Sequence, residues 1–290
     1  MFKLYILVHG KFVVCLKSKS NLNFGYKEKL LFQAYIPGMR IIKTSDKVDF
    51  VINHIESDKR KMINKRKHII IYDKWQGKIS MDIYHLIYSI VRIHYLNRKL
   101  FPIHAACINS DGLILLVGHS GSGKTNIALQ LLDKNKKKIF SGDKTIISFA
   151  SNGNIKAIAG INVVTGLTKD IKHFNNKNKI YYHGRSAFLL NEDKIASPGR
   201  IKAIVLIKIN DGKKEFHKIN FTKALHTLYP FFLDIVNADT IICEKDIFMG
   251  TPPKDIQKYL IQMLNKALNK IPVYSITGSR LYIVNKIKNI

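Results

Sequence analysis

A glycine-rich stretch at residues 118–125 carries side chains that could hold a phosphate chain. It reads GHSGSGKT and matches the pattern G-x-x-x-x-G-K-[ST] in full. Glycines let the backbone curl so that successive N–H groups face an anion, and in this pattern Lys124 reaches the β- and γ-phosphates while the Thr125 hydroxyl binds Mg²⁺. An apolar stretch precedes the loop, and a helical pattern follows it, whose positive N-terminus would face the phosphates. The sequence therefore predicts ATP and Mg²⁺ on Gly118, His119, Ser120, Gly121, Ser122, Gly123, Lys124 and Thr125.

Two side chains outside the loop decide what chemistry the phosphate could undergo. The turn NSDG predicts a β-hairpin whose register places His104 opposite Gly118, although a one-residue slip would turn this histidine to the other face. Asp143 follows the strand pattern KKIFSG and is expected at the carboxyl end of a strand, where α/β sheets bind ligands. A carboxylate there could hold Mg²⁺ or accept a proton from an attacking hydroxyl. The alternatives are a core histidine and an ordinary turn aspartate.

Three further residues compete for roles in such a site. Asp211 ends the apolar run AIVLIKIND and could serve a general ATPase, but NDGK is also a good turn sequence, and we expect a hairpin over residues 201–219. Arg185 and Arg200 follow glycines in expected loops. Either could neutralise charge on a transferring phosphoryl group, and Arg185 is counted among the predicted nucleotide-binding residues. The alternative for each is a surface arginine.

Hydrophobic periodicity gives the elements that must position these residues. We expect a boundary near residue 100, with a small α+β region at 1–100 and the catalytic domain at 101–290. The run 56–67, rich in charge, is expected to be a solvated loop, and Ser80 is expected to cap a helix. The remaining elements are strands at 2–8, 47–55, 67–73, 137–142, 145–149, 155–160 and 271–276, and helices at 80–100, 124–134, 221–236 and 252–268.

Composition limits the classes of function. The chain has 290 residues and a formal net charge of +28, which would suit nucleic acid, but lysine is spread over nearly every segment and arginine is scarce. Nucleic acid is therefore the less favoured partner, and an anionic partner or substrate remains compatible with the charge. Three distant cysteines without a CxxC pair indicate neither disulfides nor zinc. No apolar run reaches the roughly 18 residues of a membrane span, so a cytoplasmic protein without membrane contact is expected. The number of subunits stays open, a homo-oligomer included.

The stretches IHAACINSDGLILLVGHSGSGKTNIALQLL and IFSGDKTII resemble the HPr kinase/phosphorylase catalytic domain. They are most similar to its shorter relatives, including kinases that modify the tails of ribosomally made peptides such as lasso peptides. The resemblance is specific over residues 102–146, on which His104, the loop and Asp143 match the motif. It implies an α/β P-loop kinase domain with a mixed sheet. It also implies transfer of a phosphoryl group from ATP to a serine or threonine hydroxyl of a peptide or protein, activated by Asp143 and His104, with Lys124 steadying the γ-phosphate.

The sequence also departs from that family's pattern. The usual pair of aspartates reads Gly142-Asp143, and the glutamate that helps to hold metal has no counterpart in INVVTGLTKD. These departures weigh against HPr itself as the substrate and against a reverse phosphorylase reaction. A kinase of a free small molecule such as serine, a P-loop ATPase and a nucleotide-binding module without catalysis stay open as alternatives.

Overall fold

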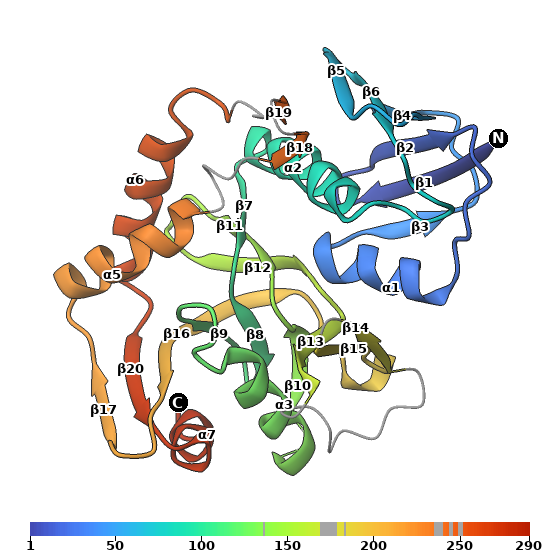
Figure 1. Cartoon of the computed structure of the whole chain (residues 1–290). Coiled ribbons are helices and arrows are strands. Elements are labelled where there is room, and N and C mark those ends of the chain that lie inside the picture. The colour runs from blue at the N-terminus through green and yellow to red at the C-terminus, as the bar shows by residue number, and fades with distance from the viewer. Residues whose placement is uncertain (136, 169–178, 183, 235–239, 244–245, 249–251) are drawn as a thin grey trace. The chain divides into compact units, whose positions relative to one another are not determined.

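The computed structural model of the chain describes residues 1–135, 137–168, 179–182, 184–234, 240–243, 246–248 and 252–290. The chain divides into two compact units, Met1–His94 with Ala238–Pro252, and Tyr95–Asn237 with Pro253–Ile290. Each unit combines helices with a mixed sheet, so the α/β class is confirmed at this level (Figure 1). The chain leaves the first unit inside helix α2, and a later segment returns to it, which no local pattern in the sequence indicated.

The first unit is built on a six-stranded sheet in the order β3-β1-β2-β4-β6-β5. Strands β2, β4 and β6 run parallel, and the other neighbours pair antiparallel. Ser80 accepts a hydrogen bond from the Asp82 amide at the start of α2, as its capping role requires. The elements of this unit are β1 (Phe2–Val8), β2 (Phe12–Ser18), α1 (Tyr26–Tyr35), β3 (Arg40–Ile42), β4 (Phe50–Glu56), β5 (Lys61–Lys65), β6 (His68–Asp73), α2 (Met81–Asn97), β18 (Thr240–Cys243) and β19 (Asp246–Phe248).

The expectation of a solvated loop over residues 56–67 is wrong. Strand β5 lies within it and pairs antiparallel with β6 at the end of the sheet order. Met62 is buried, while the lysines of the strand are exposed. Charged side chains are a usual feature of edge strands, since they prevent further pairing, and this explains why composition suggested a loop.

The second unit has a nine-stranded sheet in which β16 is the central strand. One path runs β10-β8-β9-β16-β12-β11-β7. Strand β20 also pairs with β16, on the edge opposite β9, and β17 pairs with β20. The expected hairpin of β8 and β9 is confirmed, with Ala106 opposite Leu116. The strands are β7 (Leu100–Ile103), β8 (Ala106–Asn109), β9 (Leu113–Val117), β10 (Lys138–Ser141), β11 (Thr145–Phe149), β12 (Ile155–Gly160), β16 (Gly199–Ile209), β17 (Glu215–Lys218) and β20 (Val273–Gly278).

The expected hairpin between residues 201 and 219 is wrong, although its turn exists. Strand β20 lies between β16 and β17, parallel to β16 and antiparallel to β17. Strand β20 buries Val273 and Ile276, whereas all four residues of β17 are exposed. The apolar strand therefore occupies the inner position, and a polar strand forms the edge.

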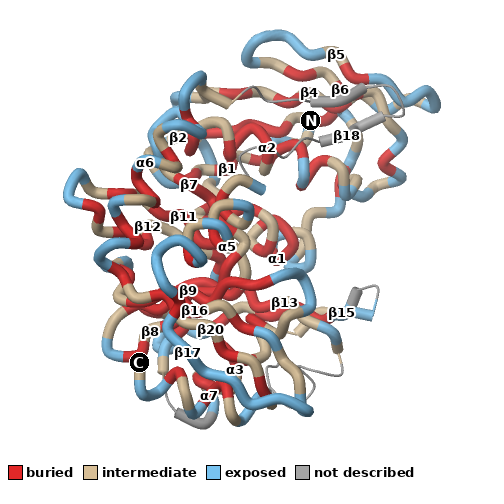
Figure 2. The backbone as a smooth tube through the Cα atoms, turned by 90° about the vertical axis from the view of Figure 1, so that its left-hand side faces the viewer, coloured by how far each residue is buried: buried red, intermediate tan, exposed pale blue. Residues whose placement is uncertain are grey.

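Helices and a small separate sheet complete the second unit. Ile127, Ala128 and Leu131 on α3 are buried, as their spacing predicts, in a cluster that includes residues of β9 and β16. Strand β9 is buried throughout, and β16 is buried mainly at its centre (Figure 2). The sheet β13-β15-β14 and helix α7 were not predicted. These elements are α3 (Lys124–Asn135), α5 (Phe221–Asp234), α6 (Ile256–Leu268), α7 (Arg280–Lys288), the short helix η1 (Glu192–Lys194), β13 (Val163–Leu167), β14 (Ile180–Tyr182) and β15 (Arg185–Leu189).

The first unit contains a buried histidine, His54, at the centre of a polar cluster. Its Nδ1 lies 2.8 Å from Ser18 Oγ and its Nε2 lies 2.9 Å from the Asp73 carbonyl oxygen. The ring stacks on Trp75 with centroids 3.4 Å apart. Burial lowers the pKa of His54, and the Asp73 carbonyl and the Glu56 carboxylate oppose this effect without cancelling it. His54 is therefore neutral in the folded protein at pH 7.

Among the described residues, no helix has the length and apolar character that crossing a membrane requires.

The lowered pKa of His54 predicts that the first unit loses stability as the solution becomes acidic. Below about pH 6.5 the unfolded chain binds a proton at this histidine more readily than the folded chain does. The free energy of unfolding therefore decreases as the pH decreases. Trp75 is the only tryptophan in the chain, and its fluorescence during urea unfolding at several pH values reports the change. The variant His54→Gln should lose about 1–3 kcal/mol at neutral pH and show a shallower pH dependence. Equal pH slopes for the two proteins would contradict this role of His54.

Candidate functional site

The loop at residues 118–125 connects β9 to α3, so it has the strand before it and the helix after it that the motif requires. Lys124 is the first residue of α3 and is only 6% exposed. Its Nζ donates to the carbonyl oxygens of Gly118, at 2.7 Å, and His119, at 3.1 Å. Burial lowers the pKa of this lysine, and the charge of Asp143 opposes that effect. The ammonium group is thus held at the first half of the loop.

The loop conformation depends on Gly123. Its φ of 95° lies in the left-handed region that side chains disfavour, and an added Cβ would overlap the Ile209 side chain. The Ser122 hydroxyl oxygen is buried and lacks a hydrogen-bond partner among the described residues. A buried hydroxyl without a hydrogen bond lowers the stability of the fold, unless a ligand supplies the missing bond.

His104 and Asp143 form the central contact of the site. His104 Nε2 lies 2.9 Å from Asp143 Oδ1, and Lys144 Nζ lies 3.1 Å from Asp143 Oδ2. The three side chains are partly buried, with exposures of 38% for His104, 24% for Asp143 and 18% for Lys144. Both oxygens of the carboxylate therefore have a partner that can carry positive charge.

Backbone pairing brings these residues together from distant positions in the chain. Strand β7 ends just before His104, and β11 begins just after Lys144, with Ile103 opposite Thr145 in the antiparallel register. The Thr145 hydroxyl donates to the Ala105 carbonyl at 2.8 Å and fixes the segment that follows His104. Asp143 itself lies beyond the carboxyl end of β10, as the sequence predicts.

The turn that carries Asp143 is closed by Ser141. Its hydroxyl donates to the Lys144 carbonyl at 2.6 Å and accepts from the Ile161 amide at 3.0 Å. Ser141 is fully buried, so these two bonds form in a water-excluded position where polar contacts count most. The carboxylate of Asp143 is therefore held by a rigid turn.

The environment keeps Asp143 ionised. Burial alone would raise the pKa of its carboxyl group, but the hydrogen bond from His104 and the charge of Lys144 outweigh burial. The pKa lies well below the ordinary range of an aspartate. Asp143 is accordingly a permanent negative charge beside His104 at any pH near neutrality.

The backbone of Gly142 connects Thr125 with Asp143. The Thr125 hydroxyl lies 3.3 Å from the Gly142 carbonyl oxygen, and Asp143 is the next residue. In the described part of the chain, no group of three or more His, Cys, Asp or Glu side chains could hold a metal. Magnesium at nucleotide sites often uses only one or two protein oxygens and completes its shell with phosphates and water. A hydroxyl and a carboxylate in this arrangement fit such a site, where Mg²⁺ would compete with Lys144 for Asp143.

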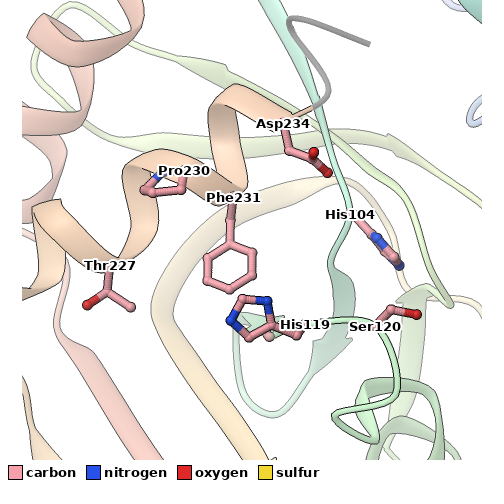
Figure 3. A pocket seen from close by; sticks show the side chains of 8 residues that line it. His104, His119, Ser120, Thr227, Pro230, Phe231 and Asp234 are labelled. Carbon is pink, nitrogen blue, oxygen red and sulfur yellow. The ribbon is translucent and has the colours of Figure 1, made fainter. Parts of the chain in front are cut away.

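A cavity of about 450 Å³ opens beside the first half of the loop. Its described lining residues come from the loop, from His104 and from one side of helix α5 (Figure 3). The ring centroids of His119 and Phe231 lie 4.9 Å apart, which joins the loop to the helix. Asp143 is not among the described lining residues. They are His104, Gly118, His119, Ser120, Thr227, Pro230, Phe231 and Asp234.

The other candidate residues belong to strands and turns of the second unit. Arg185 begins β15 and is exposed, and Arg200 is an exposed residue of β16 paired with Lys156 of β12. Neither is a described lining residue of the cavity. Asp211 is exposed in the turn that follows β16, where Gly212 N donates to the Asn210 side chain at 3.0 Å. Asp211 therefore has a structural explanation as a turn residue.

Sequence reasoning missed Lys144 and the contribution of α5. Lys144 could have been found, since it follows Asp143 directly and places a cation beside it. The approach of α5 to the loop could not, because roughly one hundred residues separate the two in sequence and no local pattern records their contact.

No protein-family model matches the chain, and no curated protein matches it significantly. The resemblance to HPr kinases therefore remains a prediction, and its specific part covers residues 102–146.

Gly142 stands where the HPr-kinase pattern has a second aspartate, and a side chain added there would be tightly packed. A Cβ at this position would lie 3.0 Å from the Val163 carbonyl oxygen and 3.5 Å from Val164. We predict that Gly142→Ala lowers the free energy of unfolding by about 1–3 kcal/mol and that Gly142→Asp lowers it further without raising activity. Chemical denaturation measures the loss.

Gly199→Ala is the matched control for this prediction. Its added Cβ would meet Leu113 at 3.6 Å, which is an ordinary contact, so its stability should change by less than about 0.5 kcal/mol. If Gly142→Asp were as stable as the parent protein, the packing explanation would be wrong.

Proposed function

We propose that the protein is an ATP-dependent kinase of the HPr-kinase-like type that transfers a phosphoryl group to a serine or threonine hydroxyl of a peptide or protein. A ribosomally made precursor peptide is one such acceptor. The observation that carries the proposal is the His104–Asp143 pair, with His104 opening into a cavity beside the first half of the loop. An enzyme that only hydrolyses ATP would not need an acceptor cavity at this place.

The donor half of the reaction would use the loop. ATP would lie with its phosphates on residues 118–125, and the helix α3 would point its positive N-terminus at them. Lys124, held at the Gly118 and His119 carbonyls, would move a short distance to the γ-phosphate and stabilise its charge as the bond to the β-phosphate breaks. Mg²⁺, where bound by Thr125 and Asp143, supplies further charge neutralisation on the phosphates.

The acceptor half would use His104 and Asp143. When neutral His104 donates its Nε2–H to Asp143, Nδ1 is the ring nitrogen that can take a proton. The acceptor oxygen forms a bond to the γ-phosphorus, the bond from that phosphorus to the β–γ bridging oxygen breaks, and the hydroxyl proton passes to His104. Asp143, which is ionised and has both oxygens engaged, then orients the imidazole and stabilises its positive charge. The sequence pattern, by contrast, predicts Asp143 itself as the proton acceptor.

We predict that Asp143→Asn and His104→Gln each reduce phosphoryl transfer by about 10²–10⁴-fold, because each removes part of the acid–base pair. Lys124→Met should reduce it at least as much, since the γ-phosphate loses its cation. The assay incubates the protein with γ-labelled ATP, Mg²⁺ and serine- and threonine-containing peptides, and detects label or a mass shift on the peptide.

Asp211→Asn is the matched control, because it removes an equivalent carboxylate from the exposed turn after β16. Its transfer activity should stay within about twofold of the parent protein, since surface substitutions have small effects. Full activity of Asp143→Asn would refute the proposal. If the protein hydrolysed ATP without an acceptor, and this hydrolysis depended on Asp211, a general ATPase would be favoured. Labelling of free serine alone would favour a small-molecule kinase. Nucleotide binding without turnover would favour a binding module.

A further inference from the structure

We infer that the cavity beside the loop binds an extended peptide segment and that Asp234 selects an acceptor with a basic residue near its hydroxyl. This inference rests on the proposed kinase function and adds the class of substrate. It follows from the position of the cavity on the loop, from its length and from its charge.

The cavity lies on the side of the loop where the γ-phosphate would be. Lys124 Nζ contacts the Gly118 and His119 carbonyls, and both of these residues line the cavity. In this motif the lysine reaches the β- and γ-phosphates. The terminal phosphoryl group would therefore face the cavity, and the adenosine would extend away from it. His104 lines the same space, so a hydroxyl bound there would lie between the phosphoryl group and its proton acceptor.

The helix wall of the cavity has the length of a short peptide. Thr227, Phe231 and Asp234 follow one another along one side of α5, at a spacing of three to four residues, and Figure 3 shows Thr227 and Asp234 at opposite ends of this row. The seven residue-to-residue rises from Thr227 to Asp234 span about 10 Å, which is the length of three extended residues. Pro230 and Phe231 form an apolar middle. A free amino acid would fill only part of such a wall.

The charge of the cavity is opposite to that of the whole chain. The described lining residues include one carboxylate, Asp234, and no lysine or arginine, although the chain carries a net charge of +28. An acidic acceptor would therefore meet a like charge beside the helix. A lysine or arginine side chain would form an ion pair there.

The test is a set of serine peptides of equal length in which Lys, Gln or Glu is placed in turn at each position near the serine. For the parent protein we expect kcat/KM to be about tenfold higher for the best lysine peptide than for the matching glutamate peptide. The variant Asp234→Lys should reverse this preference. Asp193→Lys, an exposed change of the same charge outside the cavity, should keep the parent preference. Phe231→Ala should raise KM for all peptides.

The outcomes separate this inference from the function on which it rests. If no peptide is labelled, the proposed transfer to a peptide fails, and the inference fails with it. If peptides are labelled equally well whatever their charge, or if Asp234→Lys keeps the parent preference, only the inference is overturned. Labelling of free serine more efficiently than of every peptide would also overturn it.

Discussion

The contact between His104 and Asp143 is the constraint on which the candidate site depends. It joins the end of β7 to the turn before β11, two positions that antiparallel pairing brings together. The same turn presents the Gly142 carbonyl to Thr125 in the loop. One turn, closed by Ser141, thus connects the loop proposed to bind phosphate with the residues proposed to handle the acceptor. A shift of this turn would disturb both halves of the reaction.

Local charge and total charge give different information in this protein. The net charge of +28 invites an anionic partner, yet Lys124 and Lys144 near the site are already engaged with carbonyl or carboxylate oxygens. Asp143 is kept ionised by the hydrogen bond from His104 and the charge of Lys144, and Asp234 is the carboxylate among the described residues of the cavity wall. Selection of a substrate depends on the few charges that it contacts, because solvent and salt screen the rest.

Short-range features of the fold could be predicted, and long-range ones could not. The turn and the alternating pattern determine the register of β8 and β9. Continued beyond Ala106, this register predicts that His104 lies near the loop, and His104 and Gly118 do line the same cavity. Insertion of β20 between β16 and β17 depends on a strand some 60 residues further on, which competes for the inner position by burying more apolar surface. The position of helix α5 beside the cavity also depends on a long-range contact. The loop residues proposed to bind ATP could therefore be predicted from the sequence, and the role of Asp234 could not.

The central claim is that His104 and Asp143 act as one unit in phosphoryl transfer, and a double-mutant cycle tests it most directly. Transfer to a labelled peptide would be measured for His104→Gln, for Asp143→Asn and for the variant that carries both changes. If the two residues act together, the double variant should be about as slow as the slower single variant, because the second change removes nothing that still functions. Losses that multiply, each near its single value, would contradict the claim and assign the two residues to independent roles.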